Sequence, residues 1–534
     1  MRLDCPDLRR SVHLGRSAKW LSLLAAAPLA VLLSSVAVAA EHDAAWHAAR
    51  QSITAKELGS AVEYLADDKL KGRLPGTEGS RLAAKYLRDQ LAEMGLQPAG
   101  PEGSFYQPFD PEYRNVLAKL PGRDAELRDE VIVVGAHYDH VGHGSESTSR
   151  GGVGEIHNGA DDNASGTSAV LELAEAFATL PRPPRRTLLF ALWDAEELGF
   201  HGSLHFVEHP TVPLEKIVMA INFDMVGRLR DDRLHVFGTR SSLGMRRLFS
   251  RQNDSARLNL DFNWTLRSNS DHWTFFERDI PVLLLHTGIH ADYHTPRDDA
   301  HLIEKQGMQR VTRLMFGTID ALANANRPPT FRAAALGETN SLRKRRLRQR
   351  APLPNRLGCR WSRHADRRDG VMLTRVDAEG PAAAAGLRAG DRVLRLGASE
   401  IKSPGDLEGA SVTIDRPSQL TYQRRGQAEP STVTIDPRGK PWRLGFNWII
   451  DPAEPGAAVV THVVPNTPAA RSGLRPGDYI QRFAGHDFAG REELIALAAD
   501  ATQSAKSIAL LVEREGRVET IDVHLRDLPP VVGM

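Results

Sequence analysis

Imidazole and carboxylate side chains recur at the points where apolar runs of this sequence end. The run VIVVGA is followed by a histidine and an aspartate, the run LLFALWDA by two glutamates, and the run VMAINF by an aspartate. Further candidates lie in NGADDNASG and after VLLLHTG. The candidate residues are His137, Asp139, Asp161, Glu196, Glu197, Asp224 and His294. Without metal, clustered carboxylates would repel one another and their pKa values would rise. Two divalent cations would remove this repulsion, so the pattern favours half of a two-metal hydrolytic site at 131–197, completed by the later residues.

Nitrogen and carboxylate ligands without thiolates suit zinc in an open catalytic site, while manganese and cobalt accept the same ligand types. Two metals about 3.5 to 4 Å apart need a bridging group. Asp161 is the predicted bridge because its small neighbours would let both metals approach. His137 with Asp224 would then complete one metal site, and Glu197 with His294 the other.

Two further acidic residues remain beside the predicted ligands. Asp139, two residues beyond His137, is predicted to accept the second imidazole hydrogen as an outer partner of the metal site. Glu196 remains without a predicted metal. We therefore predict that it takes a proton from the bridging water and passes this proton to the leaving amine. The other histidines of this region are interpreted as structural or surface residues: His140, His143, His157, His286 and His290.

The elements that would position these residues alternate between strands and helices. Strand-like apolar runs lie at 131–136, 187–193, 217–223 and 280–285, and helical patterns fill 165–179 and 301–324. Residues 54–96 read as two helices separated by KGRLPGTEG. This alternation predicts an α/β domain with a largely parallel sheet. Ligands of such sheets bind at the carboxyl ends of the strands, where the candidate residues lie.

The motifs GAHYDH, NGADDNASG, DAEELGFHGS, NFDMVG and DYHTPRDD, in this order, resemble the co-catalytic zinc aminopeptidases of the leucyl and aminopeptidase Y type, metallopeptidase family twenty-eight. The resemblance covers roughly residues 50–325 and implies a zinc-exopeptidase-like three-layer domain with a mostly parallel central sheet. It implies the same five ligands and Glu196 as general base. It also implies that Tyr293 stabilises an oxyanion.

The composition limits the remaining functions. The chain has 534 residues, too many for one core, and its 68 basic residues balance 67 acidic ones, which gives no argument for nucleic-acid binding. Cys5 and Cys359 are the only cysteines, so a disulfide framework is excluded.

The first forty residues have the pattern of a targeting segment. Arginines and a lysine precede an uncharged run from Trp20 to Ala40 that ends in small residues before Glu41. This pattern predicts a signal peptide at 1–40 and an exported protein, periplasmic or extracellular. The alternative is an uncleaved anchor, because the run is long enough to span a bilayer.

Residues 41–327 are predicted to form the peptidase domain, and 328–354 a linker. The linker contains SLRKRRLRQR and several prolines, a composition expected of a solvated tether. Its basic run is a candidate for contact with an anionic envelope surface.

The C-terminal part contains an internal repeat. RLGCRW at 356–361 recurs as RLGFNW at 443–448, and GPAAAAGLRAGD at 380–391 recurs as TPAARSGLRPGD at 467–478. The two modules, 355–438 and 439–528, resemble PDZ domains, which bind peptide or protein C-termini beside a sheet edge. The loop Leu444, Gly445 and Phe446 of the second module matches the carboxylate-binding loop better than its counterpart in the first.

The leading hypothesis is an exported exopeptidase with two zinc ions that releases N-terminal residues from peptides with a free N-terminus. One alternative is a glutaminyl-cyclase-like acyltransferase, although those enzymes resemble one another in having tryptophan before the last ligand, where this chain has Tyr293. The other is a peptide-binding protein in which the PDZ pair carries the activity and the α/β domain is inactive. The presence of every expected ligand and of the base favours the enzyme.

Overall fold

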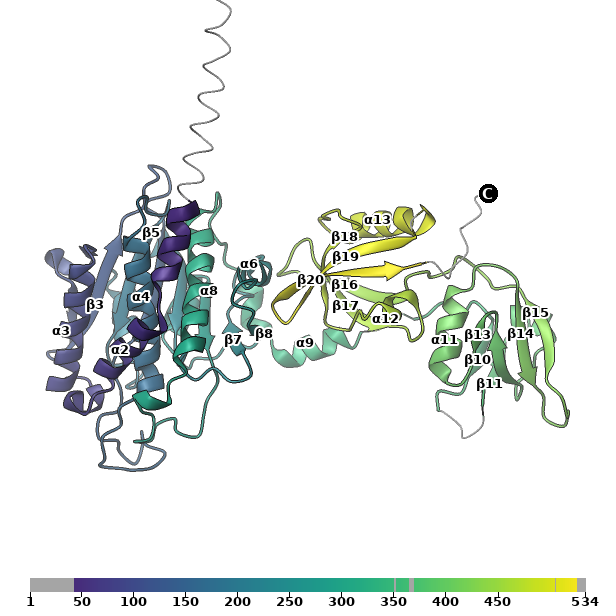
Figure 1. Cartoon of the computed structure of the whole chain (residues 1–534), viewed down its shortest axis with the longest axis horizontal. Coiled ribbons are helices and arrows are strands. Elements are labelled where there is room, and N and C mark those ends of the chain that lie inside the picture. Colours follow the sequence, from purple (N-terminus) through teal and green to yellow (C-terminus); the bar gives the residue numbers. More distant parts are fainter. Residues whose placement is uncertain (1–42, 350–351, 365–368, 505, 526–534) are drawn as a thin grey trace, which may run out of the picture.

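The computed structural model describes residues 43–349, 352–364, 369–504 and 506–525. The predicted signal peptide therefore lies outside the described residues. An α/β domain is followed by two small β-rich domains, and the second of these, in yellow, lies between the α/β domain and the first (Figure 1). Within the described residues, no helix combines the length and apolar character that crossing a bilayer requires.

A nine-stranded mixed sheet forms the centre of the α/β domain, in the order β1-β3-β5-β4-β6-β9-β7-β8, with β2 paired to β3. Its central strands β5, β4, β6 and β9 run parallel, whereas β3 and β7 pair antiparallel to their neighbours β5 and β9. The strands are β1 (Gln97–Pro98), β2 (Tyr106–Phe109), β3 (Tyr113–Leu120), β4 (Val131–His137), β5 (Thr187–Trp193), β6 (Ile217–Phe223), β7 (Arg233–Phe237), β8 (Asn259–Phe262) and β9 (Val282–His286). The four predicted strands are thus the parallel centre of the sheet.

Helices cover both faces of this sheet, which confirms the predicted three layers. Alternate residues of β4 point to opposite faces: Ile132 and Val134 join one apolar core, Val131 and Val133 the other. The first core is covered by α2 (Ala55–Leu65), α3 (Glu78–Glu93), α4 (Gly166–Ala178) and α8 (Lys305–Asn324), and the second by α5 (His201–Glu208) and α7 (His272–Phe276). The helix α6 (Met245–Gln252) contacts α8.

The two copies of the C-terminal repeat form two small domains with similar folds. The first contains β10 (Cys359–Trp361), β11 (Val371–Val376), β12 (Arg392–Leu396), β13 (Ser399–Glu400), β14 (Ser418–Gln423), β15 (Ser431–Ile435), α10 (Pro381–Ala384) and α11 (Pro404–Thr413). The second contains β16 (Phe446–Ile450), β17 (Ala458–Val463), β18 (Tyr479–Phe483), β19 (Ser507–Arg514), β20 (Arg517–His524), α12 (Pro468–Arg471) and α13 (Arg491–Ser504). Each domain has its own apolar core, as expected for independent modules.

The segment predicted to be a solvated tether is ordered over most of its length. It contains the short turn η6 (Ala333–Gly337) and the helix α9 (Asn340–Leu347), whose N-cap is Thr339. Glu338 is buried and accepts two hydrogen bonds from Arg240 of the α/β domain, so this part of the segment packs against that domain. Charge composition alone could not reveal this, because the partners of the segment come from other domains.

Candidate active site

The candidate residues lie together at one edge of the central sheet. His137 is the last residue of β4 and stands beside Trp193, the last residue of β5. Asp224 directly follows β6, and its backbone N–H donates to the carbonyl of Leu285 in β9. The parallel strands therefore deliver residues that are far apart in sequence to a common edge, as the strand order requires.

Two groups of side chains that could each hold a metal ion form at this edge. One consists of His137, Glu196 and Asp224, and the other of His140, Asp162, Glu197 and His294; in each group the nearest ligand atoms lie within 4.8 Å of one another. The carboxylate of Asp162 connects them. Its Oδ1 lies 3.4 Å from Nε2 of His137, and its Oδ2 lies 2.9 Å from Nε2 of His294.

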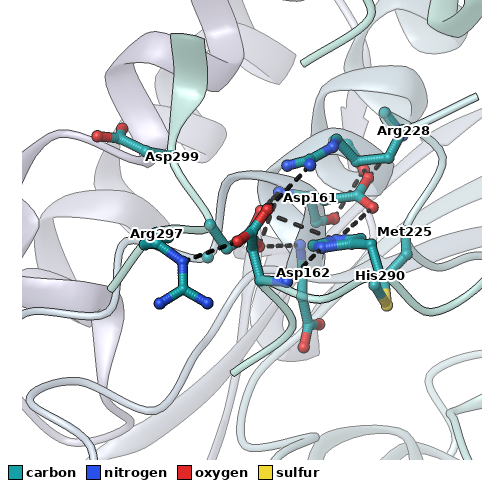
Figure 2. A network of polar contacts seen from close by, with 12 residues as sticks. Asp161, Asp162, Met225, Arg228, His290, Arg297 and Asp299 are labelled. Carbon is teal, nitrogen blue, oxygen red and sulfur yellow. Dashed lines mark hydrogen bonds and ion pairs between the residues drawn. The ribbon is translucent and has the colours of Figure 1, made fainter. Parts of the chain in front are cut away.

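Asp161, the residue predicted to bridge two metals, faces elsewhere. Its Oδ2 lies 3.1 Å from Nε2 of His290, as Figure 2 shows, and its Oδ1 accepts from the backbone N–H of Gly227 at 2.7 Å. Asp161 and Asp162 sit in the turn η3 (Ala160–Ser165), where neighbouring side chains diverge. The geometry thus brings Asp162, and not Asp161, between the two groups.

Asp139 lies behind His137 and the two glutamates. Its Oδ1 and Oδ2 accept the backbone N–H groups of Glu196 and Glu197, at 3.1 and 3.2 Å. Its Oδ1 also lies 3.5 Å from Nδ1 of His137. These contacts are compatible with the predicted role of an outer partner, which stays a prediction.

The pKa values of the buried acids reflect their burial and the charged groups around them. Burial, together with the nearby carboxylates Asp271, Glu197 and Asp224, raises the pKa of Glu196 well above its usual range, against the influence of His137. Burial acts in the same direction on Asp162, but contacts with His137 and His294 outweigh it and hold its pKa well below the usual value. Neighbouring acids with such different proton affinities are characteristic of functional sites.

The donor set fits two divalent cations. All seven side chains offer imidazole nitrogen or carboxylate oxygen, and both groups lie at low exposure within the protein. Positive charge between them would relieve the repulsion that raises the pKa of Glu196. The residues present therefore suit a pair of ions bridged by one carboxylate.

Sequence reasoning missed His140 and the loop that follows it. Nδ1 of His140 lies 2.8 Å from Oε1 of Glu197, whose other oxygen lies 3.2 Å from Nε2 of His294. Nδ1 of His294 lies 2.7 Å from the carbonyl of Thr148, which orients the imidazole toward the cluster. The adjacency of His140 to Asp139 was the available signal, but it does not reveal which way the chain turns.

Tyr293 stacks on His294, with ring centroids 4.0 Å apart, and the guanidinium of Arg150 lies 4.5 Å from the Tyr293 centroid. Burial raises the pKa of the Tyr293 phenol, so it keeps its proton and can donate a hydrogen bond. His294 has φ of 55°, in the left-handed region, so the chain bends sharply next to the cluster.

The second small domain has a groove beside the loop that contains Leu444 and Phe446. Leu444 and Phe446 line a cavity of about 200 Å³ together with Trp442, Trp448 and Leu494. The cavity lies between β16 and α13, which supply its two walls. In the first domain, Asn355 Oδ1 accepts the backbone N–H of Cys359 in the corresponding loop.

Comparisons with known proteins agree with this geometry. Residues 115–319 match the model of peptidase family M28, and residues 356–436 and 444–525 each match that of the PDZ domain. Leupeptin-inactivating enzyme 1 of Streptomyces exfoliatus is 30% identical over 268 residues, 50% of this chain and 56% of that protein. Aminopeptidase YwaD of Bacillus subtilis is 27% identical over 213 residues, 38% of this chain and 44% of that protein.

This chain thus spans about half the length of the curated relatives it matches. Among solved structures, the LapA aminopeptidase of Legionella pneumophila is 20% identical, with a TM-score of 0.44 and coverage of 53% of this chain and 76% of that one. The chain thus combines a region that matches peptidase family M28, residues 115–319, with two regions that each match the PDZ domain.

Proposed function

We propose that this chain is an exported, zinc-dependent aminopeptidase that removes N-terminal residues from peptides. The observation that carries the proposal is the carboxylate of Asp162, which contacts an imidazole of each cluster at 3.4 and 2.9 Å. A shared carboxylate between two such groups is the arrangement that two-metal hydrolysis needs. The names of the matched relatives, which include an aminopeptidase, support the reaction class.

In this proposal Asp162 replaces Asp161 as the shared ligand. His137 and Asp224 would hold one zinc ion, and Glu197 and His294 the other. When bound, the two ions polarise the scissile carbonyl and lower the pKa of a water molecule. Asp139 and His140 hold the glutamates in place through the contacts described above.

Glu196 acts as the general base. Its carboxylate takes a proton from the attacking water while the water oxygen forms a bond to the scissile carbonyl carbon. As the carbon–nitrogen bond breaks, Glu196 passes the proton to the leaving amine. The Tyr293 phenol is proposed to donate to the developing oxyanion, which its raised pKa permits.

The PDZ domains are the proposed binding sites for peptide or protein C-termini. The groove lined by Leu444, Phe446 and Trp448 would take the C-terminal residues of an extended peptide along β16. Contact with an anionic envelope surface would involve Lys344, Arg345 and Arg348, which are exposed on and directly after α9.

The test is an assay of the purified chain, loaded with zinc, on amino-acid anilides, short peptides and glutaminyl peptides. Glu196→Gln is expected to lower kcat by about 10² to 10⁴ while two zinc ions stay bound, because a base is lost and the ligands remain. Glu208→Gln, an exposed glutamate on α5, is the matched control and should keep wild-type activity.

Two results would overturn the proposal. Cyclisation of glutaminyl peptides without release of any N-terminal residue would assign the alternative acyltransferase reaction. Loss of zinc from the Glu196→Gln protein would make this residue a ligand and leave the reaction without its proposed base.

A further inference from the structure

A cleft of about 560 Å³ lies at the junction of the peptidase domain and the second PDZ domain. One wall is formed by the end of α6 and the loop behind it, and the other by β18, β19 and β20. Its volume is within the range of cavities that bind small molecules, about 300 to 1,000 Å³. The lining residues are Ser250, Arg251, Asn253, Asp254, Arg257, Gln481, Leu511, Arg517 and Val518.

Three arginines converge on this cleft with little opposing charge. Arg251 and Arg257 come from the peptidase domain and Arg517 from the PDZ domain, and Asp254 is the single acid among the lining residues. Among the described residues, none of the three arginines forms an ion pair; Arg517 donates to the carbonyl of Arg257 at 2.9 Å. Their positive charge is therefore available to a ligand.

Other arginines around the same junction are neutralised by the protein itself. Arg310 pairs with Asp232 at 2.6 Å, Arg482 with Asp487 at 3.0 Å, and Arg246 with Glu513 at 2.5 Å. These three arginines beside the cleft thus have carboxylate partners, whereas the three that line it have none among the described residues. An accumulation of this kind favours an anionic ligand, since guanidinium groups bind carboxylate and phosphate through paired hydrogen bonds.

Gln481 adds a polar group at the inner side of the cleft. It is only 4% exposed, and its side chain lines the cleft. The amide of Gln481 has both a hydrogen-bond donor and an acceptor to offer a bound molecule. Leu511 and Val518 offer apolar contact nearby.

We infer that this cleft binds a small molecule with two or three anionic groups, either carboxylates or phosphates, and that the ligand contacts both domains. Arg251 and Arg257 would hold it from one side and Arg517 and Gln481 from the other. Because the ligand would connect the domains, its binding should stabilise their junction and raise the unfolding temperature of the full chain.

The experiment titrates the full chain with inorganic triphosphate and with citrate by isothermal calorimetry, at low and at high salt. We expect at least one anion to bind with Kd below about 1 mM at low salt and to raise the unfolding temperature. Arg251→Gln, Arg257→Gln and Arg517→Gln should each weaken binding about tenfold, since each removes a charge-assisted hydrogen bond to the ligand. Tighter binding of triphosphate assigns phosphates, and tighter binding of citrate assigns carboxylates.

Arg425→Gln, which removes an exposed arginine between β14 and β15 of the first PDZ domain, is the matched control and should leave Kd unchanged. Arg257→Lys keeps the charge but not the planar fork, so we expect an intermediate loss of affinity. Each variant is compared with wild type by its unfolding temperature without ligand, which identifies any folding defect. The inference fails if neither anion binds, if the three cleft variants bind like wild type, or if Arg425→Gln weakens binding as much as they do.

Discussion

Asp161 and Asp162 are adjacent in the chain, and their carboxylates face different partners. Asp162 contacts His137 and His294, whereas Asp161 contacts His290 and the backbone of Gly227. Asp298 accepts the backbone N–H groups of both residues at 3.0 Å and so fixes the turn that separates them. The two aspartates therefore permit a matched comparison within a single turn.

Asp162→Asn is expected to reduce bound zinc below two ions per chain, because the shared carboxylate is lost. Asp161→Asn should keep both ions, since its contacts lie outside the two clusters. Metal content after dialysis, measured by mass spectrometry, distinguishes the variants. The assignment fails if Asp161→Asn loses zinc while Asp162→Asn retains it.

Arg73 is a buried cation close to the carboxylates of the site. Its guanidinium donates to the carbonyls of Tyr138 at 2.7 Å, Asn158 at 2.7 Å and Gly159 at 3.0 Å, and it also contacts that of Leu65. Burial lowers its pKa to about 10, so it stays charged at neutral pH. It thereby joins the loop after β4 to the turn that carries Asp162.

Arg73→Met should destabilise the chain by about 3 to 5 kcal/mol, because buried carbonyls and carboxylates lose their cation. Arg81→Met, at an exposed arginine of α3, should change stability by no more than about 0.5 kcal/mol. Urea unfolding of both variants measures the difference. Equal effects would show that Arg73 has no special role in the packing of these loops.

At the scale of elements, the sequence predicts strands that are apolar throughout. The strands β4, β5, β6 and β9 are buried almost completely and were predicted within a few residues. The strands β7 and β8 carry polar residues in short runs, RLHVF and NLDF, and were missed. Their place in the sheet depends on pairing with β9 and with each other, which periodicity does not reveal.

The site residues also divide into those that the sequence could place and those that it could not. Residues at the end of a strand or directly after it, such as His137 and Asp224, could be placed at the sheet edge from sequence. The choice between Asp161 and Asp162 depends on the backbone of η3, whose Asp162 and Asn163 have non-helical φ and ψ. The contact of His140 with Glu197 depends on a turn after β4. Local conformation of this kind is set by tertiary contacts rather than by residue type.

Glu172 on α4 is a buried acid remote from the metal cluster. It is 7% exposed, and burial together with Glu57 and Glu175 raises its pKa to about 8. Because the folded state holds this proton more tightly than the unfolded chain, the resulting stability is present below about pH 4.5 and is lost as the pH rises toward 8.

Glu172→Gln should remove this loss, since the amide carries no charge at any pH. The variant is expected to be more stable than wild type at pH 8.5 by a few kcal/mol, with a smaller difference at pH 5. Glu102→Gln, in an exposed turn, is the control. Urea unfolding at both pH values measures the effect, and a difference independent of pH would contradict it.

At the scale of the whole molecule, the second PDZ domain docks on the edge of the peptidase domain. The backbone N–H of Leu260 in β8 donates to Glu515 between β19 and β20 at 2.8 Å. Glu454 accepts the backbone N–H groups of Arg246 and Arg247 at the start of α6. Figure 1 shows this contact, with the first PDZ domain beyond the second. Sequence order alone would place the first PDZ domain next to the peptidase domain.

Arg240 links three segments of this junction. It donates to Glu338, before α9, at 2.5 and 2.9 Å, and to Asp451 of the PDZ domain at 2.7 and 2.9 Å, and all three residues are buried. Its guanidinium also lies 3.6 Å from the ring centroid of Trp264. A buried cation shared by two carboxylates is costly to remove, because both acids then remain unpaired.

Arg240→Ala should weaken the junction by about 3 to 5 kcal/mol. We expect the second PDZ domain to unfold in a separate calorimetric transition at lower temperature, and trypsin to cleave sooner after the basic residues of α9. Arg424→Ala is the matched control, because Arg424 pairs with Asp391 inside the first PDZ domain and should affect that domain alone. Additional replacement of Glu338 and Asp451 by alanine should recover part of the loss, since no buried acid is then left unpaired. If Arg240→Ala unfolds and is cleaved like wild type, the ion network does not hold the domains together, and the backbone contacts of β8 and α6 must do so.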